Sequence, residues 1–245
     1  MRAHPRGTPT PLRWTLAGAA ALAAGHAGPS VSAIGPLRRA LLPRLAGGGR
    51  ADHVALTFDD GPDRASTPAF LEALDGLGWR ATFFMLGCMV ERDPGLAGEV
   101  AAAGHEVALH GYDHVSHLRR APGPVEDDLR RGFDVVADAT GHAPVWFRPP
   151  YGHLSGGTCR AARRLGLRTV LWTAWGRDWT ATATAASVVG HVARAVGPGG
   201  TVLLHDSDCT SAPHSWRSAL GALPGLADLF AARRLAVGPL GDHDV

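Results

Sequence analysis

The segment ALTFDDGPDRAST, from Ala55 to Thr67, runs from an apolar stretch straight into two adjacent carboxylates and a Gly-Pro turn. The apolar stretch predicts a buried strand, and Asp59 and Asp60 stand where that strand ends. Two carboxylates crowded into one site repel each other, and one takes up a proton unless a positive charge lies nearby. We therefore expect a positive partner for the pair, and we expect Gly61 and Pro62 to make the turn that lets both side chains converge.

Predicted strands and helices alternate along the chain from His53 onward. Apolar runs of about four to seven residues predict strands, and the segments between them carry the period and the end signals of helices. The predicted strands are HVALTF (53–58), ATFFML (81–86), HEVALH (105–110), VWFRPP (145–150), RTVLWT (168–173) and GTVLLHD (200–206). About seven such β/α units predict the α/β class, with a mostly parallel sheet curled into a distorted (β/α) barrel and an active site at the C-terminal strand ends.

The composition fits one globular domain without a nucleic-acid partner. The chain has 245 residues, of which 45% are hydrophobic, and this is enough for one substantial core. There are 24 basic and 22 acidic residues and no Lys/Arg-rich face, so nucleic-acid binding is not expected. Cys88, Cys159 and Cys209 form no CxxC pair, which excludes a disulfide framework and argues against a cysteine zinc site.

The first 33 residues differ from the rest of the chain and predict export. Three arginines precede the weakly apolar run WTLAGAAALAA (14–24), and small residues follow up to Ala33. This order is typical of a secretory signal peptide, and the run is shorter than the roughly 20 residues of a membrane span. An uncleaved anchor, or an alanine-rich helix packed on the domain, is the alternative. The predicted division is 1–33 (signal peptide or membrane anchor), 34–50 (basic helical connector) and 51–245 (main domain).

Polar and titratable residues stand at the end of nearly every predicted strand. In chain order they are Asp59 and Asp60, His110, Arg148, Trp175 to Trp179, and His205 with Asp206. Because the carboxyl ends of parallel strands meet at one face of a barrel, we expect these side chains to gather in one site.

The motif HGYDH (110–114) places two histidines where they can share a metal ion. On one helical turn the imidazoles of His110 and His114 face the same way. With the carboxylate of Asp60 they offer nitrogen and oxygen ligands that suit zinc and leave coordination positions open; cobalt, nickel or manganese would also fit. His117 is an alternative ligand.

A bound cation would supply the positive partner that the opening segment requires. Asp60 would ligate the cation, and Asp59 would stay free to take a proton from a water molecule. Because the cation lowers the pKa of that water, the pair can generate a nucleophile at neutral pH.

Five motifs, TFDDGP, HGYDH, RPPYG, WGRDW and LLHD, occur in this order at strand ends. They resemble the signature motifs of the polysaccharide deacetylases, carbohydrate esterase family 4, which share the chitooligosaccharide deacetylase homology domain. The resemblance covers the chain from about Ala51 to the C-terminus. It implies a distorted (β/α) barrel that uses a divalent metal, often zinc, to remove acetyl groups from N-acetylated sugars.

The resemblance also implies a role for each motif residue near the metal. It makes Asp59 the catalytic base, and Asp60, His110 and His114 the metal ligands. Arg148 would pair with Asp59, because a neighbouring guanidinium keeps a carboxylate ionised and aims it at the water.

The remaining motif residues would handle the leaving group and the acetyl group. His205 would be the general acid that protonates the departing sugar nitrogen, with Asp178 orienting it and favouring its imidazolium form. Trp179 and Leu203 would wall the pocket for the acetyl methyl. The backbone N–H of Tyr151, together with the metal, would stabilise the tetrahedral oxyanion.

Two features depart from the family pattern or lie outside it. Members often carry Ser or Thr directly after the first metal histidine, where this chain has Gly111, so a hydroxyl that would help to position the metal ligand is missing. The segment HDSDCTSAPHSW (205–216) is interpreted as a solvated loop, with Asp208, Cys209 and His214 as alternative residues lining the cleft.

Together these inferences predict a metal-dependent hydrolase that removes N-acetyl groups from a peptidoglycan or chitin-like glycan. The expected partner is that acetylated glycan, and the expected location is outside the cytoplasm, secreted or membrane-anchored in a bacterial cell envelope. One alternative is an O-acetyl esterase acting on a xylan-type glycan, for which His205 would matter less because an ester needs less leaving-group protonation. The other is a catalytically silent glycan-binding domain.

Overall fold

The computed structural model describes residues 11–245, with side chains at residue 18 and from residue 20 onward. The start of the predicted signal peptide, with Arg2 and Arg6, lies outside the described residues.

Eight parallel strands form one sheet. They are β1 (His53–Asp59), β2 (Thr82–Met85), β3 (Glu106–Leu109), β4 (Trp146–Phe147), β5 (Arg168–Thr169), β6 (Ala174–Trp175), β7 (Thr201–His205) and β8 (Ala236–Gly238). Seven of them follow the order β5-β4-β3-β2-β1-β7-β6, and β8 pairs with the first half of β1. The sheet curls into a half-barrel, which confirms the predicted α/β class with a distorted barrel.

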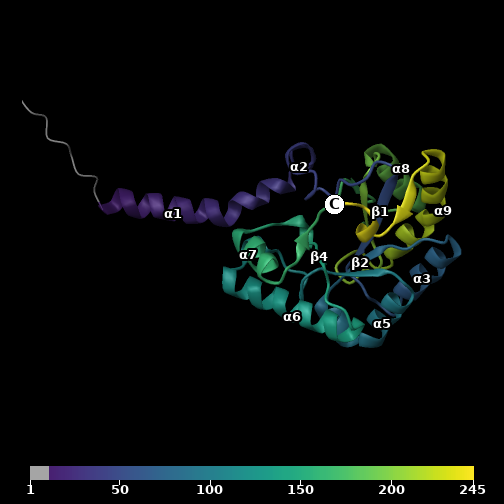
Figure 1. Cartoon of the computed structure of the whole chain (residues 1–245), viewed down its shortest axis with the longest axis horizontal. Helices are drawn as coiled ribbons and strands as arrows, with labels where there is room; N and C mark the ends of the chain where they lie inside the picture. Colours follow the sequence, from purple (N-terminus) through teal and green to yellow (C-terminus); the bar gives the residue numbers. More distant parts are fainter. Residues whose placement is uncertain (1–10) are drawn as a thin grey trace, which may run out of the picture.

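Helices cover the outside of this sheet (Figure 1). The covering helices are α3 (Thr67–Gly76), α4 (Gly87–Arg92), α5 (Pro94–Ala102), α6 (Pro122–Thr140), α7 (Gly156–Arg164), α8 (Ala185–Ala195) and α9 (Trp216–Ala232). Two further helices, α1 (Pro11–Ala27) and α2 (Gly35–Leu41), precede the first strand. Short 3-10 turns are η1 (Gly28–Ala33), η2 (His117–Arg119), η3 (Pro150–Gly152) and η4 (Leu240–Asp242). Ser155 and Thr184 begin α7 and α8 with capping boxes, and Gly141 ends α6 in the left-handed conformation.

Strand β1 runs through the centre of the sheet, and its two faces have different surroundings. Because side chains alternate along a strand, Leu56 and Phe58 point into the main hydrophobic core. The ring of Phe58 stacks on Phe83 at 5.0 Å and meets Phe70 edge-on at 5.1 Å. Thr57 lies on the opposite face, inside the barrel, where polar groups collect.

Only the first two residues of the predicted strand RTVLWT (168–173) form a strand, and the rest of the segment connects the two edges of the sheet. Those two residues form β5, and β6 begins only after the end of the segment, so the sheet is open between them. The connector occupies this opening: the Leu171 N–H donates to the Leu45 carbonyl at 2.7 Å, and the Thr201 hydroxyl donates to the Gly47 carbonyl at 2.6 Å. Ala46 between them is only 1% exposed. This segment, residues 45–47, therefore completes the barrel wall.

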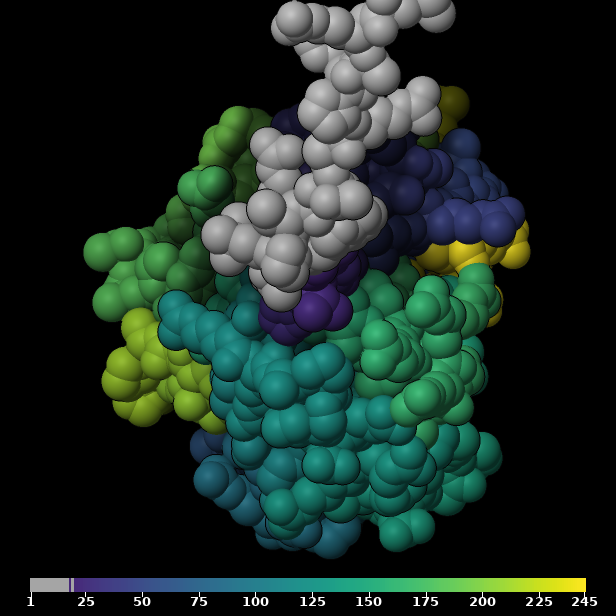
Figure 2. Space-filling view, turned by 90° about the vertical axis from the view of Figure 1, so that its left-hand side faces the viewer, coloured from purple at the N-terminus to yellow at the C-terminus, as the bar shows by residue number. Residues whose placement is uncertain are grey.

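The N-terminal helix extends away from the barrel and touches it only near its end (Figure 1). His26 Nε2 lies 3.1 Å from the Leu118 carbonyl oxygen, and Figure 2 shows the face of the molecule that carries this helix. After it, Arg38 ties η1 to the barrel by donating to the carbonyls of Ser32 and Trp172. No helix in the described part of the chain has the length and apolarity that a membrane crossing requires.

We predict that Leu56→Ala lowers the free energy of unfolding by about 2–5 kcal/mol, because the side chain is fully buried in the main core and its loss leaves a cavity. Leu41→Ala removes the same atoms from a side chain that is 67% exposed and should change stability by less than about 0.5 kcal/mol. Urea unfolding followed by circular dichroism measures both, and equal effects would contradict this assignment of the core.

Candidate active site

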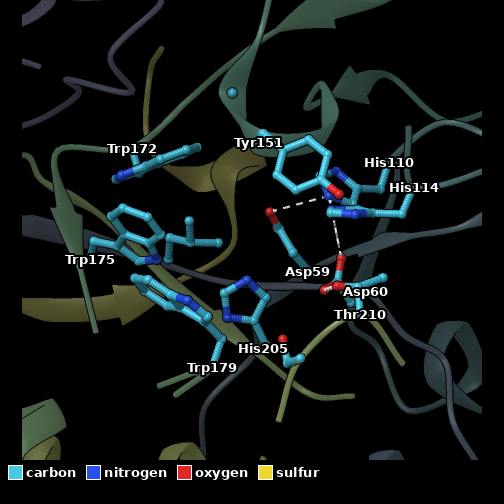
Figure 3. Close-up of a pocket in the computed structure, with 13 residues that line it drawn as sticks. Asp59, Asp60, His110, His114, Tyr151, Trp172, Trp175, Trp179, His205 and Thr210 are labelled. Carbon is cyan, nitrogen blue, oxygen red and sulfur yellow. Dashed lines mark hydrogen bonds and ion pairs between the residues drawn. The ribbon is translucent and has the colours of Figure 1, made fainter. Parts of the chain in front are cut away.

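A cavity of about 190 Å³ opens at the C-terminal ends of the central strands (Figure 3). It is lined by Asp59, Asp60, His110, His114, Tyr151, Gly152, Trp172, Trp175, Trp179, Leu203, His205, Thr210 and Ser211. Two predicted site residues do not line the cavity. Arg148 lies behind Asp59, and Asp178 lies behind His205. The structure thus brings all ten predicted site residues together around one cavity.

The chain reverses at Asp60, one residue earlier than the predicted Gly-Pro turn. Asp60 has a φ of 78°, in the left-handed region that few non-glycine residues adopt. Asp59 still belongs to β1, and this reversal lets both neighbouring carboxylates face the cavity although strand residues normally alternate. Their exposed fractions are 3% and 2%, so both are held in a largely dry environment.

Asp60, His110 and His114 form a group that fits a divalent cation. Asp60 Oδ1 lies 3.4 Å from His110 Nε2 and 3.5 Å from His114 Nε2, and all three donor atoms lie within 4.8 Å of one another. Asp60 Oδ1 is buried and has no hydrogen-bond partner in the described part of the chain. Burial lowers the pKa of both histidines, so their imidazoles are neutral and have lone pairs to offer.

Groups behind these ligands fix their orientation. His110 Nδ1 lies 2.7 Å from the Arg148 carbonyl oxygen, so a backbone group orients this ring although Gly111 has no hydroxyl. Thr210 donates its hydroxyl to Asp60 Oδ2 at 2.6 Å, and the Cys209 thiol contacts the Asp60 carbonyl at 3.3 Å. Thr210 therefore holds one carboxylate oxygen and leaves the other for the cation.

Thr210 is a site residue that the sequence analysis missed. It belongs to the segment that was interpreted as a solvated loop. The run of polar residues after LLHD was the feature of the sequence that could have indicated a site residue there. Of the alternatives named in that loop, Cys209 contacts Asp60, whereas Asp208 accepts a hydrogen bond from the His214 backbone within the loop.

The alternative ligand His117 lies outside the metal group. It is fully buried, stacks against Phe147, and its Nε2 lies 3.5 Å from Asp128 Oδ2. The same carboxylate accepts hydrogen bonds from the backbone N–H groups of Tyr112 and Asp113. His117 thus belongs to a cluster that holds the loop between the two metal histidines.

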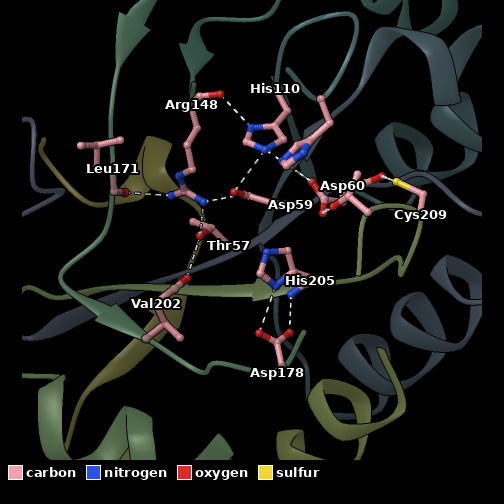
Figure 4. Close-up of polar contacts among 12 residues, drawn as sticks. Thr57, Asp59, Asp60, His110, Arg148, Leu171, Asp178, Val202, His205 and Cys209 are labelled. Carbon is pink, nitrogen blue, oxygen red and sulfur yellow. Dashed lines mark hydrogen bonds and ion pairs between the residues drawn. The ribbon is translucent and has the colours of Figure 1, made fainter. Parts of the chain in front are cut away.

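Asp59 is paired with a guanidinium that is itself completely buried (Figure 4). Arg148 Nη1 donates to Asp59 Oδ1 at 2.6 Å and to the Thr57 hydroxyl at 2.9 Å, while Nη2 donates to the Leu171 carbonyl at 2.9 Å. Burial raises the pKa of Asp59 to about 6 although Arg148 and His205 act in the opposite direction. The carboxylate is therefore ionised at neutral pH but remains a usable base.

His205 is held from behind by Asp178. Its Nδ1 lies 3.0 Å from Asp178 Oδ1, and its backbone N–H donates to Oδ2 at 2.7 Å. Burial alone would lower the pKa of His205, but the charge and hydrogen bond of Asp178, with smaller contributions from Asp60 and Asp59, raise it to about 10. The ring is therefore an imidazolium at neutral pH.

Indole rings form the wall of the cavity beside His205. Trp179 stacks on Trp175 with ring centroids 4.2 Å apart, and Trp175 meets Trp172 at 5.4 Å (Figure 3). Leu203, from β7, is 2% exposed and completes this side. Trp179 and Leu203 had predicted roles, and Trp175 was expected at the site without a role. Trp172 was not expected there, although it lies in a predicted strand.

Tyr151 covers the opposite side of the cavity. Its φ of 59° is again left-handed, and its side chain is 57% exposed. The ring meets His114 edge-on with centroids 4.4 Å apart. The side chain thus packs over a metal ligand while the backbone turns at the cavity wall.

Asp206, which ends the predicted strand, faces away from the cavity. Its Oδ2 accepts a hydrogen bond from the Thr67 hydroxyl at 2.6 Å, and its carbonyl accepts one from Ser66. A Cβ on Gly61 would lie 2.3 Å from Asp206 Oδ2, so only glycine fits there. Burial raises the pKa of Asp206 to about 7. This carboxyl group fixes the turn that follows Asp60.

Comparison with known proteins agrees with these motifs. A family model described as polysaccharide deacetylase matches residues 46–170. A peptidoglycan-N-acetylglucosamine deacetylase of Bacillus cereus is 37% identical over 156 residues, which are 62% of this chain and 72% of that protein. A chitooligosaccharide deacetylase of Bradyrhizobium is 34% identical over 184 residues, 71% of this chain and 84% of that protein.

A solved structure has the same fold. The family 4 carbohydrate esterase of Streptomyces lividans, in complex with acetate, superimposes with a TM-score of 0.68 at 32% identity. The match covers 76% of this chain and 92% of that one.

We predict that Asp178→Asn lowers the pKa of His205 from about 10 to about 6.5 or below, because an amide carries no charge to stabilise the imidazolium. NMR titration of the His205 ring would measure this. Asp208→Asn, in the neighbouring loop, should leave that pKa unchanged. A His205 pKa that stays above 9 without the Asp178 charge would contradict the assignment.

We also predict that Thr210→Val weakens zinc binding about tenfold or more, because the hydrogen bond that orients the Asp60 carboxylate is lost. Thr210→Ser keeps the hydroxyl and should stay within about twofold of the unmodified chain. Calorimetric titration of the metal-free protein with zinc gives both affinities. Equal affinities for the valine and serine variants would show that Thr210 does not position this ligand.

Proposed function

The chain belongs to the polysaccharide deacetylase family, and we propose that it removes N-acetyl groups from an N-acetylglucosamine glycan such as peptidoglycan or a chitin oligomer. The observation that carries the proposal is the gathering of a candidate base, a metal-ligand group and a candidate acid around one cavity. These groups come from β1, the loop after β3 and the end of β7, far apart in the sequence. The family and the activities named for its relatives support the same substrate class.

Asp60, His110 and His114 would hold the divalent cation. Two neutral imidazoles and one carboxylate suit zinc, with cobalt, nickel or manganese as alternatives. When bound, such a cation lowers the pKa of water and polarises an acyl oxygen.

Asp59 would act as the general base. Arg148 holds Oδ1, so Oδ2 is the oxygen available to take a proton from the attacking water. A pKa of about 6 suits this task, because the group is ionised at neutral pH and its basicity is close to the working pH.

His205 would act as the general acid on the departing amine. An amine is a poor leaving group until its nitrogen is protonated, and the imidazolium supplies that proton from Nε2 while Asp178 holds Nδ1. A pKa of about 10 keeps the proton in place at neutral pH, so the acid is ready before each turnover.

The walls of the cavity would position the acetyl group. Trp179 and Leu203 offer an apolar surface for its methyl group. The backbone N–H of Tyr151 would donate to the oxyanion that develops as water adds to the carbonyl carbon. The whole cavity measures only about 190 Å³, which suits a small acyl group better than a bulky one.

We place the protein outside the cytoplasm, in the bacterial cell envelope. The signal-like composition of residues 1–33, together with cell-wall glycan as the substrate named for the Bacillus cereus relative, supports this location. Helix α1 projects from the barrel, which suits the proposal that residues 1–33 are a signal peptide.

We predict that Asp59→Asn and His205→Ala each lower the rate of acetate release from N-acetylglucosamine oligomers at least about a hundredfold, because each removes one proton transfer. His205→Ala should slow an acetylxylan ester much less, since an alkoxide leaves more readily than an amine anion. Acetate release from both substrates, with melting temperature as the folding control, measures these effects. Undiminished release from the oligomers by either variant would exclude the proposed mechanism.

Metal loading distinguishes the enzyme from a silent glycan-binding domain. We expect acetate release to stop on chelation and to return with zinc, because the ligand group supplies no nucleophile by itself. A zinc-loaded chain that binds glycans and releases no acetate from peptidoglycan, chitin oligomers or acetylxylan would favour the silent domain.

A further inference from the structure

A second cavity of about 580 Å³ adjoins the catalytic one and is lined by arginines. The two cavities share Trp172 and Trp175 as a common wall. The basic residues of the second cavity, here called the arginine cavity, are Arg38, Arg39, Arg177 and Arg194. They come from the connector helix α2, the loop after β6 and helix α8.

None of these four guanidinium groups pairs with a carboxylate in the part of the chain whose side chains the structure describes. Arg38 is 5% exposed, donates only to backbone carbonyls, and keeps a buried Nε without a partner. Arg39 reaches only the Thr173 carbonyl, at 3.4 Å. By contrast, Arg64 on another face binds two carboxylates. The arginine cavity therefore carries positive charge that the protein leaves uncompensated.

Arg39, Arg177 and Arg194 are exposed, and the last two lie on either side of His191. Arg194 Nη2 lies 2.9 Å from His191 Nδ1. Burial and the charges of Arg194 and Arg177 lower the pKa of His191, so the imidazole adds no charge and serves as an acceptor. Both guanidinium groups remain free to bind an anion from solution.

The shared indole wall connects this charge to the catalytic centre. Trp172, Trp175 and Trp179 follow one another from the shared wall to the ring of His205 (Figure 3). Indole faces offer apolar contact area, and sugar rings have apolar C–H faces that pack on them. A glycan whose acetamide lies beside His205 can therefore extend along the tryptophans into the arginine cavity.

We propose that the arginine cavity binds a carboxylate carried by a sugar adjoining the one that is deacetylated, so that the enzyme selects an anionic glycan over a neutral one. Arg177 and Arg194 bind the carboxylate, because guanidinium groups form paired hydrogen bonds with it. Chitin oligomers have no such group, whereas a muramic acid residue without an attached peptide carries a free lactyl carboxylate. This inference rests on the proposed function and narrows its substrate to peptidoglycan strands whose muramic acid residues carry free lactyl carboxylates.

The test compares two matched tetrasaccharides of alternating N-acetylglucosamine and N-acetylmuramic acid. One has free lactyl carboxylates, and in the other these are converted to methylamides of nearly the same size. With the zinc-loaded full chain, we expect kcat/KM for acetate release to be about tenfold higher for the free acid. Equal values for the two would overturn the proposal.

Arg177→Asn/Arg194→Ala removes the two exposed charges that are proposed to bind the carboxylate. Asparagine suits the left-handed φ of 55° at position 177, and alanine suits helix α8. For this variant, we expect kcat/KM for acetate release from the acid and from the amide to agree within about twofold. Its rate on the N-acetylglucosamine tetramer should equal that of the unmodified chain. The control, Arg160→Ala/Arg163→Ala, removes two exposed arginines from α7 and should keep the tenfold preference. A preference that survives in the Arg177/Arg194 variant would overturn the proposal.

Binding separates this proposal from the proposed function. Calorimetry with the full-length, zinc-loaded Asp59→Asn chain should show about tenfold tighter binding of the free acid than of the amide. If no substrate is deacetylated by the unmodified chain but this binding preference is present, the proposed function fails and the arginine cavity stands. If acetate is released but neither the rate nor the affinity differs between the acid and the amide, the proposed function stands and the proposal for the arginine cavity fails.

Discussion

The buried guanidinium of Arg148 is the group on which the rest of the site depends. It binds the Asp59 carboxylate and the Thr57 hydroxyl on β1 and the carbonyl of Leu171 beyond β5, while its own backbone carbonyl orients His110. One residue thus connects the base, a metal ligand and the wall of the barrel. Removing one partner of such a buried ion pair costs about 3–5 kcal/mol, because the other charge is left in a poorly solvated interior.

Neutral histidines and a charged histidine face each other across the cavity, and this arrangement suits the proposed chemistry. On one side, burial keeps the histidines His110 and His114 neutral, which favours metal binding. On the other side, Asp178 makes His205 a cation in spite of burial. The same residue type therefore has two protonation states in one small space, and the difference comes from a single carboxylate placed behind one ring.

Much of this arrangement could be predicted because parallel strands align their ends. Asp59, His110, Arg148 and His205 each follow an apolar run, and the α/β barrel then brings them to one face. The two short strands at 168–169 and 174–175, in place of one strand at 168–173, could not be predicted, because strands of two residues have no recognisable period. The contact of Thr210 with Asp60 was also hidden, since it depends on how a loop closes. The roles assigned to the site residues remain predictions.

The connector segment at residues 45–47 has a consequence for how this protein can be built and handled. It fills the opening between β5 and β6, and next to it the Arg50 N–H donates to the carbonyl of His243 near the other end of the chain. The barrel is therefore sealed by residues that precede its first strand. A shortened chain beginning at residue 51 would leave the Leu171 N–H without its acceptor and water could enter the interior, so a unit that keeps the barrel closed must include residues 45–47.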